Sequence, residues 1–538
     1  MTCLLQNFIV MKPLISAAPP VIGYLNYPGT THIDEWVTDN QVISNSRTPT
    51  AAATIGALAG YTIVESGVLA GAQPLTVAGP ATSLGPFNGG GKVITTANNT
   101  LYGMTTVQNG AIYQVGLDTA ATTGSVNSTT VQSGGLLNLY GANTALFTKV
   151  GPLTTDVGGT ASWDGPDICG QGYFTNGGAV TNNGVINIDN SMWRLSTSIA
   201  GTGTVNVKDG GTFGNAGLNV PTQQNFNLNG CGWCNSAGVR QGALFFEGVG
   251  YWYATTTIET ASCIKSAPGA GVYFQGLLKG SAPLEAGNTG SPVTGIVVFQ
   301  NPANTYDGTL TSNGSLVAIS STAMKYATLT AINGGQITSN SGTFKSIYGS
   351  DATSYLTGSG NTYIENNGVT QFDGRFLWDG QSSGHNIYLQ GGSGNQLTLT
   401  AKGSAATLYV QGGSKLTLQG ASTTGQVRVL NGSVVSAGTS TDAATGYLLI
   451  DATSSLEVRA VGSGSSVINI VGAGGVNVAA GWKVDLPDAM APGVYTIIKN
   501  SGGAAVILPT TGVNNTGLTA TYAWDNTVAP KVLKMTLA

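Results

Sequence analysis

The stretch that decides the fold is TTVQSGGLLNL, at residues 129–139. A closely similar phrase, TTVQNGAIYQV, occupies residues 105–115, and DVGGTASWD follows at 156–164. Each phrase reads as a short alternating run, a turn that contains Gly or Asn, and a second alternating run. Alternation of polar and apolar residues indicates a β-strand, because successive side chains point to opposite faces. Gly and Asn supply the positive φ that a tight corner requires.

The phrase recurs along most of the chain at a nearly constant spacing. The glycines that mark its turn lie 24 to 26 residues apart in the first half and near 20 to 22 apart in the second. The marks are Gly110, Gly134, Gly158, Gly184, Gly210, Gly314, Gly334, Gly392, Gly412, Gly432 and Gly475. Such a period predicts a solenoid, in which each strand pairs in parallel with the next coil. Stacking at about 4.8 Å then predicts roughly seventeen coils between residues 100 and 478, and a rod on the order of 80 Å long.

The composition supports an all-β chain. Of 538 residues 80 are Gly, hydrophobic residues make up 41%, charged residues make up 8%, and the net charge is −4. Disordered chains usually combine low hydrophobicity with high net charge, which is the opposite balance. Thr, Ser, Asn and Gly suit sheets and turns, and no stretch longer than about ten residues shows a capped helical period. The predicted fold class is therefore all-β, a parallel β-helix.

Differences in repetition divide the chain into five segments. Residues 1–95 are rich in Pro and Ala and predict an irregular N-terminal adaptor. Residues 96–214 and 301–478 carry the repeat and predict two solenoid parts. Between them, residues 215–300 are rich in aromatic side chains and off the pattern, which predicts an insertion or irregular coils. Residues 479–538 carry longer strands and predict an antiparallel β cap over the exposed last edge.

Several partners and cofactors are not expected. The mild acidity and scattered Lys and Arg argue against nucleic-acid binding, which needs a clustered basic surface. No apolar run approaches the roughly 18 residues of a membrane span, so we expect no membrane insertion. The opening apolar run is short and Lys12 interrupts it, which disfavours a secretory signal. With two histidines, His32 and His385, and a single CxxC, we predict neither a metal site nor a cofactor.

The cysteines give an incomplete signal. Their number is odd, so they cannot all pair within one chain. The five are Cys3, Cys169, Cys231, Cys234 and Cys263. CGWC at 231–234 has the spacing of a redox motif, but a thioredoxin-like site needs a following helix, and nothing helical is expected there. We expect two incidental thiols or one loop disulfide within CGWC, and the sequence leaves its disulfide state open.

Two groups of proteins show a resemblance to this chain. The phrases NPANTYDGTLTSNGSLVAIS at 301–320 and APGVYTIIKNSGGAAVILP at 491–509 resemble the β-strand repeats of bacterial autotransporter passengers. The layout of a rod with unlike ends resembles the tail spikes and fibres of bacteriophages. Autotransporters carry a leader and a C-terminal membrane domain that we do not expect here, which favours the phage interpretation.

The phage resemblance implies a structural, receptor-binding appendage of the virion, located on the phage tail or particle surface. It implies a homotrimer that contacts other virion proteins through the N-terminal segment and a host cell-surface glycan or protein elsewhere. One alternative is a secreted, autotransporter-like adhesin passenger at the cell surface. Another is a tail spike with polysaccharide-depolymerase activity, a glycoside hydrolase or lyase, although we lean against an enzyme.

The first candidate site is QFDGRFLWDGQ, at residues 371–381. Asp373 and Asp379 supply the two carboxylates that polysaccharide cleavage needs, as acid and as base or nucleophile. Trp378 is placed to stack on a sugar, and Arg375 is a second glycan-binding candidate. The structural alternative, which we favour, is that the two Asp-Gly pairs form turns.

The second candidate site lies in GALFFEGVGYWYATTTIE, at residues 242–259. Glu247 is flanked by Tyr251, Trp252 and Tyr253, and Glu259 supplies a second carboxylate. Aromatic clusters with a polar edge are enriched at binding surfaces, which predicts glycan binding. The structural alternative, again favoured, is a small core beneath an insertion or a subunit contact.

Overall fold

The computed structural model is built of strands and turns throughout. It describes residues 34–37, 40–57, 60–78, 91–97, 99–117, 127–141, 147–166, 169, 171–176, 178–217, 219–220, 223–288, 295–320, 322–365, 368–377, 384–502 and 507–538. These residues contain no helix, and so none that could span a membrane. The prediction of an all-β chain is confirmed.

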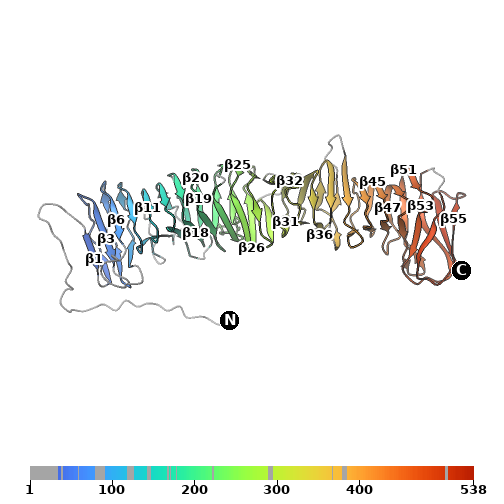
Figure 1. The fold of residues 1–538 in the computed structure, drawn as a ribbon, viewed down its shortest axis with the longest axis horizontal. Coiled ribbons are helices and arrows are strands. Elements are labelled where there is room, and N and C mark those ends of the chain that lie inside the picture. The colour runs from blue at the N-terminus through green and yellow to red at the C-terminus, as the bar shows by residue number, and fades with distance from the viewer. Residues whose placement is uncertain are drawn as a thin grey trace.

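The strands stack as a parallel solenoid of about 17 turns, and Figure 1 shows the resulting rod from the N-terminal to the C-terminal coils. Two sheets follow one another along one side of it. The first sheet has eight strands: β1 (Asp34–Val37), β3 (Ala53–Ala57), β6 (Leu75–Ala78), β9 (Thr105–Val107), β11 (Thr129–Val131), β14 (Leu153–Thr155), β17 (Val180–Asn182) and β20 (Ile199–Ala200). The second sheet has seven: β25 (Val249–Trp252), β27 (Gly271–Phe274), β30 (Ile296–Phe299), β32 (Leu316–Ser320), β34 (Gln336–Asn340), β37 (Tyr355–Thr357) and β40 (Arg375–Phe376).

A long sheet runs almost the full length of the rod in two branches. The first branch contains β2 (Gln41–Ile43), β4 (Thr62–Glu65), β7 (Lys92–Thr95), β10 (Ile112–Val115), β12 (Leu136–Tyr140), β15 (Thr160–Asp164), β18 (Val185–Asp189), β21 (Thr204–Val207), β23 (Asn225–Gly230) and β28 (Leu278–Lys279). The second contains β13 (Phe147–Val150), β16 (Tyr173–Asn176), β19 (Met192–Leu195), β22 (Thr212–Asn215), β24 (Leu244–Phe246), β29 (Leu284–Asn288), β31 (Thr309–Asn313), β33 (Thr328–Ile332), β36 (Ser346–Gly349), β39 (Val369–Phe372), β42 (Gln396–Leu399), β44 (Lys415–Leu418), β46 (Val434–Ser436), β48 (Ser455–Glu457), β52 (Lys483–Leu486) and β54 (Thr510–Asn514). The twelve-residue β26 (Thr255–Ser266) joins the branches, because it pairs with β23 through its first half and with β24 through its second.

A third sheet of ten strands forms the remaining side of the C-terminal half. Its strands are β35 (Thr343–Phe344), β38 (Gly360–Ile364), β41 (His385–Leu389), β43 (Thr407–Val410), β45 (Ser422–Val429), β47 (Ala443–Ile450), β51 (Ile468–Val478), β53 (Gly493–Asn500), β56 (Lys531–Leu537) and β55 (Ala520–Asp525). Two short pairs complete the set: β5 (Ala70–Gly71) with β8 (Thr100–Leu101), and β49 (Ala460–Val461) with β50 (Gly464–Ser465). β53, β56 and β55 pair antiparallel, which confirms the predicted cap at the C-terminal end.

The register explains why the chain repeats its phrases. Thr129 pairs with Thr105, and Leu136 pairs with Ile112, so the two similar phrases lie directly beside one another in adjacent coils. The same in-phase stacking aligns an outward-facing threonine in six successive coils of the first sheet. This threonine ladder consists of Thr54, Thr76, Thr106, Thr130, Thr154 and Thr181. Equivalent residues therefore recur at each step along the rod.

Glycine is required at the corners for two different reasons. Gly134 has a φ of 74°, a left-handed conformation that side chains other than Gly rarely adopt. Gly184 lacks this conformation, but a Cβ there would lie 2.2 Å from the carbonyl oxygen of Gly159 in the preceding coil. The corners therefore combine special backbone angles with very close approach between coils.

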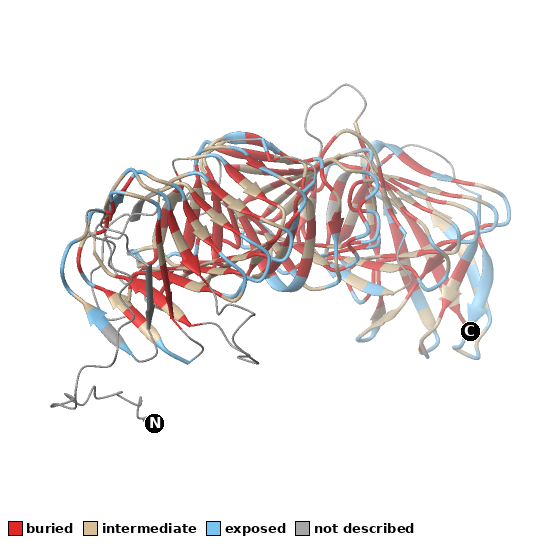
Figure 2. Ribbon diagram, turned by 60° about the vertical axis from the view of Figure 1, so that its left-hand side comes forward, coloured by how far each residue is buried: buried red, intermediate tan, exposed pale blue. Residues whose placement is uncertain are grey.

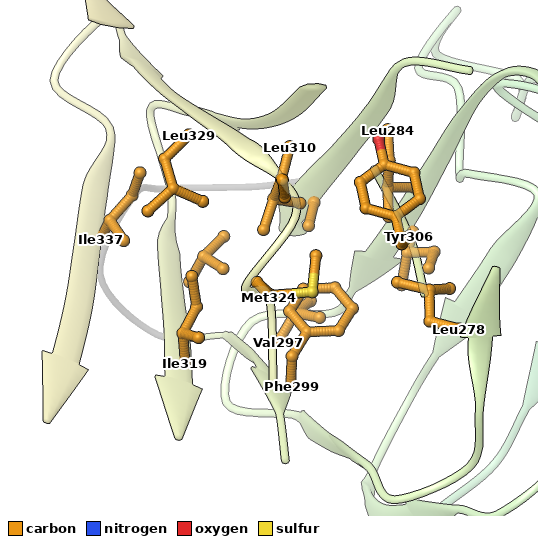
Figure 3. Close-up of a cluster of buried hydrophobic side chains, with 14 of the residues drawn as sticks. Leu278, Leu284, Val297, Phe299, Tyr306, Leu310, Ile319, Met324, Leu329 and Ile337 are labelled. Carbon is orange, nitrogen blue, oxygen red and sulfur yellow. The ribbon is translucent and has the colours of Figure 1, made fainter. Parts of the chain in front are cut away.

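The core is a continuous row of apolar side chains inside the coils. Figure 2 shows buried residues alternating along the strands from one end of the rod to the other. In Figure 3, Leu310, Ile319, Leu329 and Ile337 point inward from adjacent strands, around Met324. One coil cannot bury such residues alone, whereas stacked coils bury them completely. Each fully buried Leu or Ile stabilises the fold by roughly 1.5–3 kcal/mol.

The parallel ladder extends beyond the two segments that carry the clearest repeat. Pairing between β1 and β3 places coils well before residue 96, the boundary predicted from the repeat. Strands β23 to β30 continue the ladder through the aromatic segment at 215–300. Near the C-terminus, β54 still pairs in parallel with β52 beside the antiparallel cap. Residues 1–33, the first third of the expected N-terminal adaptor, lie outside the described residues.

Candidate functional site

The first predicted site is described only in part, because Trp378 and Asp379 fall outside the described residues. Asp373 lies at the corner between β39 and β40, where its Oδ1 accepts hydrogen bonds from Gln371 (2.6 Å) and Thr400 (2.7 Å). Arg375 lies on the next side of the coil, in the second sheet, paired with Tyr355. Asp373 thus has a structural role at a corner, and its catalytic pairing with Asp379 stays a prediction.

In the second predicted site, strand alternation separates the aromatic residues. Tyr251 is 40% exposed, whereas Trp252 is fully buried and donates its indole N–H to Thr256 Oγ1 at 2.8 Å. The expectation that Trp252 contacts a glycan is therefore wrong, since its ring belongs to the core. Tyr251 packs on the outer surface with Tyr253 and Tyr273, at ring-centroid distances of 6.0 and 5.2 Å.

The two glutamates of this site each have a separate partner. Arg194 donates from Nε to Glu247 Oε2 at 2.6 Å, and this hydrogen bond raises the pKa of Arg194 above its ordinary value. Glu259 accepts a hydrogen bond from Asn229 at 2.9 Å. Glu247, just after β24, is thus half of an ion pair that reaches across β22 to Arg194 in β19, and its role in glycan binding stays a prediction.

The CGWC segment forms two disulfides, and neither joins its own cysteines. Cys231 bonds to Cys263, and Cys234 bonds to Cys169, which corrects the expectation of free thiols or one local loop disulfide. Together they hold the CGWC hairpin, residues 231–242, against the rod. Within the hairpin, Trp233 donates its indole N–H to the Gln171 carbonyl and packs with Met192, Phe245 and Tyr173 in a small separate core.

A groove that the sequence did not reveal opens on the long sheet next to Asp373. Its volume is about 560 Å³. The lining residues are Thr309, Thr328, Thr330, Tyr348, Val369, Thr370, Gln371 and Thr398. The groove forms where β36 and β39 pair through a single position, Gly349 with Phe372, so that these neighbouring strands diverge. We call it the side groove, and its lining is neutral.

The third sheet carries a row of aromatic side chains that was not predicted from the sequence. Tyr363, Tyr388 and Tyr409 occupy equivalent positions in β38, β41 and β43, followed by Arg428 in β45. The rings stack at centroid distances of 4.8 and 4.5 Å, with interplanar angles of 23° and 12°. The Arg428 guanidinium lies 5.4 Å from the centre of the Tyr409 ring. We call these four half-buried residues the tyrosine strip.

Hydrogen-bonded amides flank the tyrosine strip on both sides. On one side Asn386 donates to Asn361 at 3.0 Å. On the other, Gln411 donates to Gln390 at 2.6 Å, and Gln390 donates to Glu365 at 2.9 Å. These bonds run from coil to coil, so the outer face has a fixed arrangement of side chains.

Tyr388, in the middle of the strip, is a neutral hydrogen-bonding group at physiological pH. Burial raises the pKa of Tyr388 above its ordinary value, and the adjacent hydroxyls of Tyr409 and Tyr363 raise it further. Elsewhere in the described part of the chain, no group of three or more His, Cys, Asp or Glu residues is placed to hold a metal ion. The strip offers phenol hydroxyls and one guanidinium, and the side chains that flank it offer amides.

Comparison with known proteins adds no family to this description. No protein-family profile matches the chain, and no curated protein matches it. The fold itself is compatible with tail-spike and adhesin-like proteins, which share the β-solenoid architecture.

Proposed function

We propose that the chain is a rod-shaped attachment protein: a homotrimeric tail spike or fibre that binds a phage particle to a host cell surface. The observation that supports this most is the uninterrupted stack of about 17 turns, whose sides carry regular rows of outward-facing residues. Solenoids with such sides offer long binding surfaces of a kind that a compact domain lacks. The N-terminal segment would join other virion proteins, and the sides would meet a host glycan or protein.

The antiparallel cap supports a rod whose C-terminal end is not attached to the particle. An open solenoid end exposes unpaired strand edges that promote aggregation. Here β53, β56 and β55 cover part of that end with antiparallel pairing. In this proposal the capped end points away from the particle. Three copies side by side would multiply the contacts of one rod and raise the overall affinity for a repetitive surface.

One structural observation favours the alternative of a secreted adhesin. Disulfides form and persist in oxidising surroundings such as cell and virion surfaces, and they are rare in the cytosol. Both cysteines of CGWC are oxidised to distant partners. A passenger exported before it folds would acquire these bonds directly, whereas a virion protein would acquire them after release from the cell.

A depolymerase is the remaining alternative, favoured by the side groove beside Asp373. Gln371 lines the groove and donates to Asp373, so a sugar chain in the groove would lie near this carboxylate. An Asp373→Asn variant tests the activity on capsular polysaccharide. Unchanged release of reducing ends by this variant would remove the site from consideration.

The attachment function is tested with the full-length protein and a panel of bacterial strains. We expect saturable binding of the labelled protein to some strains, and immunogold labelling of purified phage particles. Competition between free protein and particle adsorption would show that both use one receptor. Gold on the producing cells but not on particles would favour the adhesin, and no binding to any cell would overturn attachment.

A further inference from the structure

We infer that the tyrosine strip binds an extended acidic polysaccharide, one of whose anionic groups is held by Arg428. This inference rests on the proposed attachment function and names the surface and the ligand class. The strip consists of Tyr363, Tyr388, Tyr409 and Arg428 on the outer face of β38, β41, β43 and β45.

The spacing of the rings favours a chain that runs along the rod. The three rings stack face to face, at 4.8 and 4.5 Å between centroids, so they offer their edges and hydroxyls to a ligand rather than their faces. The edge of an aromatic ring carries partial positive charge and attracts oxygen atoms. A pyranose ring is about as long as the rise of one coil, about 4.8 Å, so successive sugars of an extended chain would meet equivalent groups.

The amides that flank the strip are already ordered before a ligand arrives. Asn386 is tied to Asn361, and Gln411 is tied through Gln390 to Glu365. Binding commonly costs about 0.5–1.5 kcal/mol for each flexible side chain that must be immobilised. Because these flanking amides are fixed by one another, a ligand that contacts them along the strip avoids much of that cost.

The charge of Arg428 selects an anion. Its Nε and one terminal nitrogen donate to Gln426 Oε1, at 2.9 and 2.7 Å, and its plane lies near Tyr409. The amide oxygen positions the guanidinium without neutralising it. In the described part of the chain no carboxylate lies within ion-pair distance of Arg428. The other N–H groups remain available, and a guanidinium binds carboxylate, sulfate and phosphate groups through paired hydrogen bonds.

The opposite end of the strip and the side groove are less suitable for an anion. The carboxylate of Glu365 lies in β38's coil, three coils from Arg428, where it accepts from Gln390. The side groove is lined by Thr, Tyr, Val and Gln residues and has no basic side chain in its lining. An acidic chain would therefore be oriented with an anionic group at the Arg428 end.

The test uses the full-length protein and two matched pairs of polymers: polygalacturonate with its methyl ester, and dextran sulfate with dextran. Affinity electrophoresis and calorimetry measure binding at several salt concentrations. We expect at least one acidic polymer to bind, its neutral counterpart to bind at least about tenfold more weakly, and the affinity to fall with added salt.

Variants locate the binding surface. Arg428→Gln and Tyr388→Ala should each weaken binding by about tenfold or more, and Tyr388→Phe, which keeps the stack, should weaken it less. Lys402→Gln removes an exposed charge elsewhere, and Tyr348→Ala removes a tyrosine from the side groove, so both should bind as the unaltered protein does. Circular dichroism confirms that each variant is folded.

Several results would overturn the inference. Equal binding of the acidic and neutral polymers, or an Arg428→Gln variant that binds like the unaltered protein, would contradict it. A loss of affinity in Lys402→Gln equal to that in Arg428→Gln would also contradict it, because it would indicate unspecific charge attraction. If the protein binds cells but neither acidic polymer, this inference fails while attachment stands. If it binds neither cells nor polymers, attachment fails as well.

Discussion

Glu457 shows how a single charged residue is stabilised on the solenoid. Its side chain is 11% exposed and lies between Lys415 Nζ (2.6 Å) and Arg459 Nε (2.7 Å), and Arg459 also pairs with Asp488 (3.2 Å). Burial alone would raise the pKa of Glu457, but the hydrogen bonds and charges of Lys415 and Arg459 outweigh it, so the pKa lies below its usual range. The ionised form therefore stabilises these coils.

We predict that Glu457→Gln destabilises the C-terminal coils by about 2 kcal/mol, because two part-buried cations lose the negative charge that pairs with them. Thermal unfolding and hydrogen exchange at β48 measure the loss. Since the folded pKa is depressed, the stabilisation is complete above the unfolded pKa of about 4.3 and is lost as pH falls through the folded value. The difference between the two proteins should therefore shrink in acid.

The control for this prediction is Lys402→Gln, which removes the Lys402–Asp442 pair. Both of these side chains are more than half exposed, and we expect an effect within about 0.5 kcal/mol. An effect of Glu457→Gln that is no larger than this control, or that grows as the pH falls, would contradict the account.

Gly349 makes room for the aromatic ring beside the side groove. A Cβ at this position would lie 2.8 Å from two carbons of the Phe372 ring and 3.2 Å from the Ala331 carbonyl oxygen. We predict that Gly349→Ala destabilises the protein by about 1–3 kcal/mol through this overpacking. Adding Phe372→Leu should recover part of the loss in thermal unfolding, and strictly additive costs would show that the ring is not the cause.

Strand alternation explains which site residues the sequence could place. Tyr251, Trp252 and Tyr253 are consecutive, so they could not all share the outer face, and the buried Trp252 follows from the period of two. The tyrosine strip also had a signal: TYIE at 362–365, IYLQ at 387–390 and LYVQ at 408–411 place tyrosine at one position of the coil. Aligning the coils by that position, rather than by glycine, would have revealed it.

At the scale of elements, the corner determines how one coil leads to the next. The phrase DATS occurs at 351–354 and at 451–454, and in both places Asp accepts hydrogen bonds from the Thr two residues later. Burial raises the pKa of Asp351, but the hydrogen bonds from Thr353 and Ser354 outweigh it and lower the pKa to about 2. Turn residues of this kind can be read from sequence, because the interaction is local.

The CGWC hairpin depends on its disulfides more than the coils do. Its small core contains few apolar side chains, whereas the neighbouring strands pair across β23, β24 and β26. We predict that mild reduction increases tryptic cleavage after Arg240 by about tenfold or more, while the far-ultraviolet spectrum keeps its β character. Mass spectrometry of the oxidised protein should find Cys231–Cys263 and Cys169–Cys234.

Two outcomes would contradict this description of the hairpin. One is a Cys231–Cys234 disulfide in the peptide map, and the other is loss of the β spectrum at the reductant concentration that exposes Arg240. The pairing could not be predicted from the sequence. Cys169 and Cys234 are 65 residues apart, and the spacing of cysteines alone does not determine which pairs meet.

At the scale of the whole molecule, the repeat was sufficient to predict the rod but not its limits. The marks at Gly134 and Gly158 have the positive φ expected of corners, and strands pair in parallel on either side of them. The first coils, from Asp34 on, were missed, although Gly60 precedes Thr62 by two residues as Gly110 precedes Ile112, and both glycines have a positive φ. The aromatic coils at 215–300 were missed because the CGWC hairpin lengthens one turn, so the spacing there does not match the period.

The stacking of coils is tested most directly by distances along the threonine ladder. In a Cys3→Ser background with the disulfides intact, spin labels at Thr54 and Thr181 are five coils apart, and labels at Thr54 and Thr154 are four. At about 4.8 Å for each coil, we predict mean distances near 24 and 19 Å by double electron–electron resonance. A Thr54–Thr154 distance that is not shorter than the Thr54–Thr181 distance by about one strand spacing would contradict the stacked solenoid.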